Sequence, residues 1–410
     1  MYQALIFKLD SIKSDIEILN KDSKKKEENV IFSKTINLSL FSLGYHYYID
    51  RTIDALNITK NIKSEEKFYT VVNPFEDIIS NYDDSLKNLT KHYLNSKKET
   101  DKHSTFYKYW EMLFLFFEPN NKDTFIVLNE NKNADPIIDA YVNFKDKLDN
   151  GTGKDNIMSL SNPINIYKFA TTFKTRKDIT SKNKNNASLI IADGGSDENG
   201  KTLEQDSYEV LLEEIIDSLK VQAVKGSLIL KLFPSFTMIT LKLLYILSSF
   251  YEEVYIYKPY FSKQTLSEKY IICKNFKKVN NNAIKSLEDV LDEITDSKNK
   301  NKYVFDIYPD LVVPESFVDK FKFINTKLAN GQQIIINDIV SYIKENNYFG
   351  DKYHMYRENQ INATKWWVSN FYPPTNNLFE KNKEDLKKLI DISIEKSSIE
   401  ENKLLSLLVK

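Results

Sequence analysis

The stretch that decides the fold runs from Ser188 to Lys274 and contains three short apolar pieces. These are Leu189-Ile-Ile-Ala-Asp193-Gly-Gly195, Gly226-Ser-Leu-Ile-Leu-Lys231-Leu-Phe233 and Leu266-Ser-Glu268-Lys-Tyr-Ile-Ile-Cys-Lys274. Each piece is typical of a buried strand with a charged residue at or near one end. A segment with helical apolar periodicity separates the first two pieces, and such alternation indicates an α/β sheet rather than a helical bundle or a sandwich.

The same alternation extends to both sides of this stretch. Asp135 and Pro136 suit the N-cap and first turn of a helix that follows a short strand. Only about ten residues precede the last strand, too few for a crossover helix, so it should run antiparallel. We expect a Rossmann-like, mostly parallel sheet with an antiparallel last strand. The expected strands are 124–128, 188–193, 227–233, 253–257 and 268–273, and the expected helices are 105–118, 137–148, 163–173, 203–224 and 236–250.

Changes in composition divide the chain into three parts. Residues 1–100 contain a single glycine and patches of helical periodicity, which predict a mainly α N-terminal extension. Residues 101–278 form the Rossmann-like domain, and residues 279–410 are predicted to be a mainly α C-terminal region. Amphipathic helical segments are expected there at 283–294, 316–328 and 332–345.

Composition excludes several classes of protein. The chain has 410 residues, 41% hydrophobic, with 57 basic and 58 acidic side chains, so it is a globular protein without bulk polyelectrolyte character. Cys273 is the only cysteine, which excludes an intrachain disulfide and a multi-cysteine zinc site, and the four histidines show no ligand spacing. We expect no metal.

No transmembrane or secretory segment is predicted. The most apolar region, 228–250, is interrupted by Lys231, Pro234 and Lys242 and indicates a strand and a buried helix. No apolar stretch follows a basic start at the N-terminus. We therefore expect a soluble protein of a reducing, cytoplasmic compartment.

Charged residues are predicted to converge at one edge of the sheet. Asp193 and Lys231 lie at or close to the carboxyl ends of parallel strands, where such sheets bind ligands. Glu268 begins the antiparallel strand and so starts from the same edge. Lys108 lies early in the helix that precedes the first strand, which places it near this edge as well.

The sequences around these residues resemble those of FtsJ-type ribose 2′-O-methyltransferases. Asp193, Lys231 and Glu268 lie in IADGG, LILKLF and KPYFSKQTLSEKYIICKNF, and they are similar to the Asp, second Lys and Glu of that family's Lys-Asp-Lys-Glu tetrad. Lys108, in FYKYWEML, corresponds to the first lysine. The closest likeness is to mRNA cap methyltransferases of eukaryotes and large DNA viruses, and it covers about residues 105–276.

The resemblance implies a function. S-adenosylmethionine would donate a methyl group in line to a ribose 2′-hydroxyl in the cap region of mRNA, with a neutral or hydrogen-bonding Lys231 orienting the hydroxyl and helping to deprotonate it. The segment GTGKDNI resembles the family's Gly-Asp-Ile segment, which implies that Asp155 lies near the adenine. The implied partners are capped RNA and other capping, transcription or virion proteins, in the host cytoplasm, a viral factory or the virion. The predicted cofactor-binding residues are Asn129, Asn131, Asp135, Asp155 and Asp193.

One feature departs from this pattern. The family's first strand ends in a glycine-rich loop that lets the backbone approach the cofactor, but the segment from Asn129 to Pro136 contains no glycine. The alternative is therefore a catalytically inactive methyltransferase fold that serves as an RNA-binding or scaffolding subunit of a capping or virion complex.

Three other patterns have rival interpretations. The segment Gly195–Thr202 fits a phosphate-binding P-loop, although Asp197 and Glu198 would repel phosphates and Thr202 with Gln205 fits a helix capping box. The aromatic residues at 366, 367, 371 and 372 could stack a base or pack a helix end. Lysines at 174–184 could contact RNA phosphates or form a solvated loop.

Overall fold

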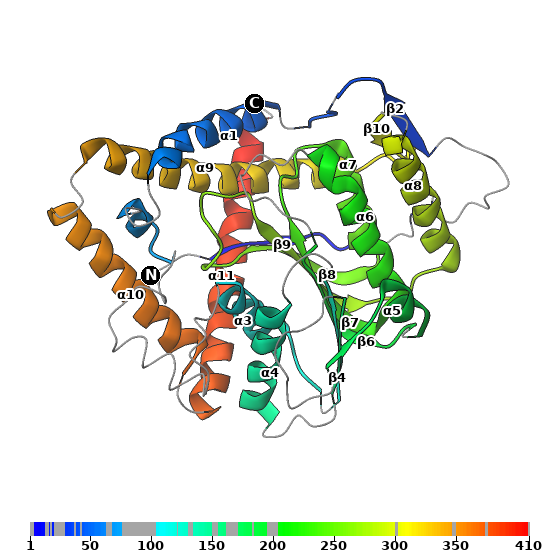
Figure 1. Ribbon diagram of the computed structural model, residues 1–410, viewed down its shortest axis with the longest axis horizontal. Helices are drawn as coiled ribbons and strands as arrows, with labels where there is room; N and C mark the ends of the chain where they lie inside the picture. The colour runs from blue at the N-terminus through cyan, green and yellow to red at the C-terminus, as the bar shows by residue number, and fades with distance from the viewer. Residues whose placement is uncertain are drawn as a thin grey trace.

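An eight-stranded sheet runs through the middle of the computed structural model (Figure 1). Its strand order is β1-β8-β9-β7-β6-β3-β4-β5. The strands are β1 (Leu5–Leu9), β3 (Thr124–Leu128), β4 (Asn156–Ser159), β5 (Thr171–Phe173), β6 (Ala187–Ala192), β7 (Gln222–Leu232), β8 (Tyr251–Lys258) and β9 (Lys269–Phe276). The structure describes residues 4–12, 16, 19, 29–36, 38–41, 43–62, 68–75, 104–120, 122–129, 134–149, 155–160, 171–182, 184–194, 204–299, 302–346, 350–373 and 376–408.

The pairing confirms the expected sheet. The strands β7, β6, β3, β4 and β5 run parallel to one another, and β9 is antiparallel to both β7 and β8. Crossover helices between β3 and β8 account for the parallel strands, while the short return from β8 to β9 permits only an antiparallel pair. The fold is a Rossmann-like α/β fold with additional elements.

Alternate side chains of the central strands pack into two separate hydrophobic cores, one on each face of the sheet. In β3, Ile126 and Leu128 belong to one core, whereas Phe125 and Val127 belong to the other. This period of two is what a strand buried on both faces requires. The first core is covered by α5 (Arg176–Lys182), α6 (Glu204–Val221), α7 (Met238–Ser249) and α8 (Asn281–Asn299), and the second by α3 (Ser104–Phe116), α4 (Asp135–Asp149), α10 (Asp351–Phe371) and α11 (Asn376–Leu408).

The N-terminal region contains strands that we did not predict. β1 pairs antiparallel with β8, from Leu5 opposite Lys258 to Leu9 opposite Val254, and so extends the main sheet. β2 (Val30–Ser33) pairs with β10 (Tyr303–Ile307) in a separate two-stranded sheet. Both pairs join segments far apart in the sequence, which local periodicity cannot reveal. The helical elements described in this region are α1 (Leu43–Ala55), η2 (Leu56–Asn61) and η4 (Phe68–Val72).

Three predicted helical segments are corrected. The helix expected at 163–173 is wrong at its end, because Thr171–Phe173 form β5 beside β4, and residues 161–170 lie outside the described part. The two segments expected at 316–328 and 332–345 are one helix, α9 (Glu315–Glu345). Gly331 lies within this helix and lowers its intrinsic stability, but it does not end the helix. A Cβ at this position would meet no atom within 4 Å.

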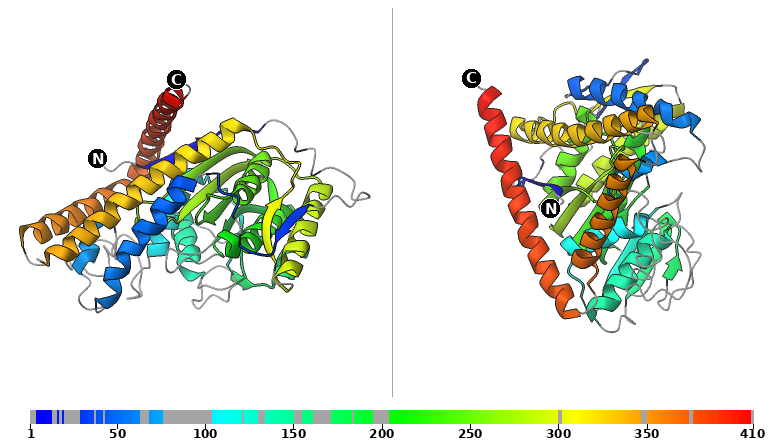
Figure 2. Two further views of the ribbon diagram at one scale, coloured as in Figure 1. Left: turned by 90° about the horizontal axis from the view of Figure 1, so that it is seen from above. Right: turned by 90° about the vertical axis from the view of Figure 1, so that its left-hand side faces the viewer.

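The C-terminal helices lie along the outside of the molecule. α9 and α11 are long, and the C-terminal part of α11 extends beyond the body of the protein (Figure 2). α11 packs against β1 and α3, which ties the C-terminal region to the second core. Among the described residues, no helix is both long and apolar enough to cross a membrane.

Candidate active site

The four residues expected to converge do so at the carboxyl edge of the sheet. Lys231 Nζ lies 2.8 Å from Asp193 Oδ1 and 3.4 Å from Glu268 Oε1, and Lys108 Nζ lies 2.7 Å from the same Glu268 oxygen. Asp193 follows β6, Lys231 lies near the end of β7, and Glu268 directly precedes β9. Lys108 is in the second turn of α3. We name these four residues the tetrad.

Glu268 is the centre of the tetrad. Its side chain is 6% exposed and contacts both lysines. Burial alone would raise the pKa of the Glu268 carboxyl, but the positive charges of Lys108 and Lys231 outweigh burial and hold the pKa well below its usual range. Glu268 is therefore ionised at neutral pH and holds the two ammonium groups near each other.

Two buried tyrosines support the carboxylates of the tetrad and were not predicted. Tyr270 donates its hydroxyl to Glu268 Oε1 at 2.8 Å. The Tyr109 ring packs edge-on against Tyr270, with centroids 5.6 Å apart. Burial, followed by the charges of Asp193 and Glu268, raises the pKa of Tyr109 well above its ordinary value, so its hydroxyl stays protonated. Neither tyrosine differs in sequence pattern from an ordinary core residue, so nothing marked them in advance.

The turn after β6 is fixed by a second buried carboxyl group. The Gly194 backbone N–H donates to Glu214 Oε1 of α6 at 2.6 Å. A Cβ at Gly194 would lie 2.5 Å from that oxygen, so a larger residue here would force the Glu214 carboxyl group to shift. Burial raises the pKa of Glu214 to about 8, and the neighbouring charge of Asp193 adds to this rise. Glu214 is thus largely protonated at neutral pH.

The segment 259–268 returns the chain from β8 to β9 and ends at Glu268; we call it the return segment. Lys258, which is buried, donates to the backbone carbonyls of Leu266 at 2.9 Å and Glu268 at 2.8 Å. Lys269, also buried, donates to the carbonyl of Phe233 after β7. These bonds hold Glu268 beside the end of the strand that carries Lys231.

Three of the predicted cofactor-binding residues lie near this edge. The Asp193 N–H donates to the Leu128 carbonyl at 3.1 Å, so Asp193 and Asn129 follow adjacent strands. Asn129 is buried, and Asp135 is buried in the first turn of α4. Asn131 lies outside the described residues. The cofactor role of these residues stays a prediction.

The predicted position of Asp155 is corrected. Asp155 immediately precedes β4, so it lies at the amino edge of the parallel sheet, opposite the tetrad. Its carboxylate accepts hydrogen bonds from the Asp123 backbone N–H at 2.8 Å and the Tyr141 hydroxyl at 3.0 Å, and it lies 3.4 Å from Lys145 Nζ. Asp155 therefore joins α4 to the sheet, and it does not face the edge where a ligand would bind.

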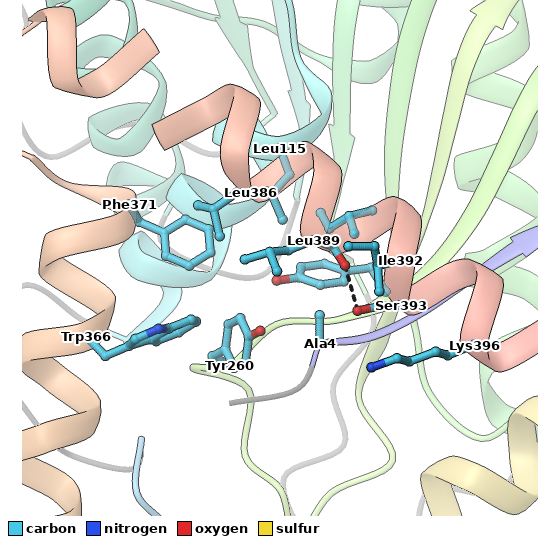
Figure 3. A pocket seen from close by; sticks show the side chains of 12 residues that line it. Ala4, Leu115, Tyr260, Trp366, Phe371, Leu386, Leu389, Ile392, Ser393 and Lys396 are labelled. Carbon is cyan, nitrogen blue, oxygen red and sulfur yellow. Dashed lines mark hydrogen bonds between the residues drawn. The ribbon is translucent and has the colours of Figure 1, made fainter. Parts of the chain in front are cut away.

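The aromatic residues near the end of α10 divide into two groups. Trp367, Phe371 and Tyr372 are buried in the second core, which favours the packing interpretation for them. Trp366 is partly exposed and lines a pocket of about 210 Å³ with Tyr260 (Figure 3). No tetrad residue lines this pocket.

The remaining alternatives are limited by what the structure describes. The predicted P-loop at 195–202 lies outside the described residues. Within the predicted basic loop, Arg176 of α5 pairs with Asp217 at 3.3 Å, so its charge is already compensated. In the described part of the chain, no cluster of histidine, cysteine or acidic residues could hold a metal ion.

The tetrad geometry suits a reaction that needs an oriented amine. Two carboxylates fix the position of Lys231 Nζ, and both are themselves held by hydrogen bonds or ion pairs within the protein. A lysine amine in such a setting can orient a substrate hydroxyl and take part in removing its proton.

Comparisons with known proteins agree with this geometry. Residues 131–276 match the sequence model of the family described as FtsJ-like methyltransferase. The cap-specific mRNA (nucleoside-2′-O-)-methyltransferase 1 of Caenorhabditis elegans is 31% identical over 168 residues, which cover 39% of this chain and 18% of that protein. An inactive cap-specific mRNA (nucleoside-2′-O-)-methyltransferase 1B of Caenorhabditis briggsae is 26% identical over 169 residues, 39% of this chain and 20% of that protein.

A viral protein is also similar. An uncharacterized protein of Acanthamoeba polyphaga mimivirus is 26% identical over 203 residues, which cover 49% of this chain and 55% of the viral protein. The chain spans about a fifth of the length of the two nematode relatives. We conclude that residues 131–276 form an FtsJ-like methyltransferase domain, homologous to cap-specific mRNA 2′-O-methyltransferases.

Proposed function

We propose that this protein transfers a methyl group from S-adenosylmethionine to a ribose 2′-hydroxyl in the cap region of mRNA. The observation that carries the proposal is the placement of Lys231 Nζ between two carboxylates, 2.8 Å from Asp193 and 3.4 Å from Glu268. The homology of the domain to cap 2′-O-methyltransferases supports the choice of capped RNA.

In this proposal, Lys231 acts on the nucleophile. Its Nζ hydrogen-bonds the 2′-hydroxyl and, in the neutral form, accepts the hydroxyl proton as the new bond to carbon forms. Asp193 and Glu268 keep Nζ in place, and Lys108 is held by the same Glu268 oxygen. Positioning supplies much of the acceleration, because the sulfonium of S-adenosylmethionine is already a good leaving group.

The carboxyl edge of the sheet contains groups that fit the cofactor. Asn129 and Asp193 follow adjacent strands, and Asp135 lies in the first turn of α4. Their amide and carboxylate oxygens are acceptors suited to the ammonium group and ribose hydroxyls of S-adenosylmethionine. When bound there, the cofactor supplies the methyl group on a positively charged sulfur.

The test compares the wild type with Lys231→Ala. Wild-type protein is expected to methylate capped RNA, while Lys231→Ala should lose the activity and keep its affinity for S-adenosylhomocysteine within about twofold, because Lys231 acts on the acceptor. Titration calorimetry measures the affinity, and transfer of a labelled methyl group measures the activity. Equal activity of the two proteins would refute the assigned role.

An inactive RNA-binding or scaffolding subunit is the second candidate. It is favoured by the absence of glycine between Asn129 and Pro136, where the family has a glycine-rich loop. The similarity to a protein named as an inactive cap-specific mRNA methyltransferase also supports it. Failure of S-adenosylmethionine to bind at millimolar concentration, with capped RNA still bound, would favour this candidate over the enzyme.

A further inference from the structure

Glu111 is fully buried, and each partner of its carboxylate among the described residues is a hydrogen-bond donor. Its Oε2 accepts from the Tyr257 hydroxyl and the Tyr260 backbone N–H, both at 2.9 Å. Its Oε1 accepts from Trp367 Nε1 at 2.9 Å and from the Phe261 backbone N–H at 3.3 Å. An ionised carboxylate offers two acceptor oxygens and no donor, so it matches this set of four donors. Burial opposes ionisation and raises the pKa of Glu111 to about 7, while the four hydrogen bonds favour the ionised form.

These bonds connect the two sides of the tetrad. Glu111 lies on α3, one turn after Lys108, and Tyr260 and Phe261 begin the return segment that ends at Glu268. Lys108 and Glu268 form the 2.7 Å ion pair. Glu111 therefore links α3, which carries Lys108, to the return segment, which ends at Glu268.

The surroundings of Glu111 keep water out. The Tyr107 and Phe261 rings stack with centroids 4.9 Å apart, and Trp367 packs edge-on against both. In such an environment each hydrogen bond to a carboxylate is stronger than in water, and an unmatched polar group is costly. The exact pairing of donors and acceptors should therefore control the geometry of this junction.

We propose that Glu111 is a positioning residue of the methyl transfer site, which holds Lys108 against Glu268 by fastening α3 to the return segment. Through Trp367, the C-terminal helix α10 becomes part of the same support. This inference rests on the proposed function, in which the tetrad orients the ribose hydroxyl. It also assigns a role to a C-terminal helix that lies outside the matched family segment.

Glu111→Gln is the most direct test, because it preserves the shape and reverses the bonding of one atom. The new amide group would face two donors, so the Tyr260 or Phe261 N–H would lose its acceptor. We expect kcat to fall about tenfold to a hundredfold, because a displacement of about 1 Å at a catalytic group has an effect of this size. KM for capped RNA and the Kd for S-adenosylhomocysteine should stay within about twofold.

Amide hydrogen exchange provides a measurement that does not require activity. Exchange within the return segment should be about tenfold faster or more in Glu111→Gln, because the N–H group of either Tyr260 or Phe261 loses its buried acceptor. Exchange should match that of the wild type in β3 and β6, because the hydrogen bonds of Glu111 in the described structure go to β8, the return segment and α10.

Two tryptophan variants test the same role if the Glu111→Gln protein fails to fold. Trp367→Phe removes one donor to Glu111 and keeps a ring in the core, and it should lower kcat by up to about tenfold. Trp366→Phe makes the same change one residue earlier, at a ring that lines the pocket, and should leave kcat unchanged.

The outcomes separate this inference from the proposed function. Unchanged exchange in Glu111→Gln, or equal kcat values for Trp367→Phe and Trp366→Phe, would overturn the role of Glu111. Faster exchange with unchanged kcat would also overturn it, since Glu111 would then be only structural. A wild-type protein that binds capped RNA and the cofactor without methylating would refute the proposed function, and the exchange data would still decide whether Glu111 holds the return segment.

Discussion

Replacing Glu268 by glutamine tests the electrostatic centre of the tetrad. The substitution removes one negative charge and keeps the side-chain shape. The lost charge lies 2.7 Å from Lys108 Nζ and 3.4 Å from Lys231 Nζ, and its side chain is 6% exposed. Two buried ammonium groups would then repel each other with Asp193 as the only tetrad carboxylate left.

The distances give the size of the effect. At an effective permittivity of about 20, the two contacts correspond to gross attractions of roughly 6 and 5 kcal/mol. Desolvation of the carboxylate and repulsion between the lysines offset part of this, and removing one partner of a buried ion pair typically costs about 3–5 kcal/mol. We expect the free energy of unfolding to fall by about 3 kcal/mol, which lowers Tm by about 3–4 °C, because a chain of 410 residues has an unfolding entropy of roughly 0.9 kcal/mol/K at Tm.

The loss of unfolding free energy caused by Glu268→Gln should become smaller at low pH. Because the folded-state pKa of Glu268 is depressed below its ordinary 4.5, the carboxylate contributes stability above about pH 4.5, and this contribution is lost as the pH falls towards the folded-state pKa. The difference in unfolding free energy between wild type and Glu268→Gln should therefore shrink as the pH is lowered below 4.5.

Urea denaturation followed by circular dichroism measures this difference at pH 7 and at pH values down to 3. Methyl transfer by Glu268→Gln should also fall about a hundredfold, because Lys231 Nζ loses one of its two carboxylate contacts. A stability difference below about 1 kcal/mol at pH 7, or one that grows on acidification, would refute the electrostatic reasoning.

Three further outcomes follow from other sites. Gly194→Ala should destabilise the protein by about 1–3 kcal/mol in urea titrations, because the new Cβ would lie 2.5 Å from Glu214 Oε1; an unchanged midpoint would contradict this contact. Asp155→Asn should lower the unfolding free energy by about 2–3 kcal/mol and leave S-adenosylhomocysteine affinity unchanged, whereas a large loss of affinity would restore a cofactor role. Burial raises the pKa of Glu111 from 4.5 to about 7, so between these pH values the native state binds more protons than the unfolded state. The unfolding free energy of the wild type, measured relative to Glu111→Gln, should therefore fall as the pH rises from about 4.5 to 7. A difference that does not change with pH would argue against the raised pKa.

The central sheet could be predicted because its strands are local signals. Five of its strands, β3, β6, β7, β8 and β9, are apolar runs long enough to be recognised alone, and the lengths of their connections indicate their directions. The shorter strands β4 and β5 were not predicted. The same rules placed Asp193, Lys231 and Glu268 at one edge. Chain topology and strand ends therefore sufficed to bring the tetrad together.

The parts that escaped prediction depend on contacts distant in sequence. β1 is five residues long and is stabilised as a strand by pairing with β8, about 250 residues later. Asp155 lies in a segment that resembles a cofactor motif, but its place at the amino edge depends on where β4 begins. Glu111 could be noticed in the sequence only as a carboxylate within an aromatic helix. Its four hydrogen-bond donors come from β8, the return segment and α10, which are distant in sequence, so its role could not be predicted.

The most direct measurement of the central claim is methyl transfer to matched capped RNAs. One RNA carries ribose at its first two transcribed nucleotides, and the other carries 2′-deoxyribose at both. With labelled S-adenosylmethionine, we predict incorporation into the ribose substrate and none into the deoxyribose substrate. Equal labelling of both RNAs, or no labelling of the ribose substrate when cofactor and RNA are both bound, would contradict the assignment of the tetrad to 2′-O-methylation.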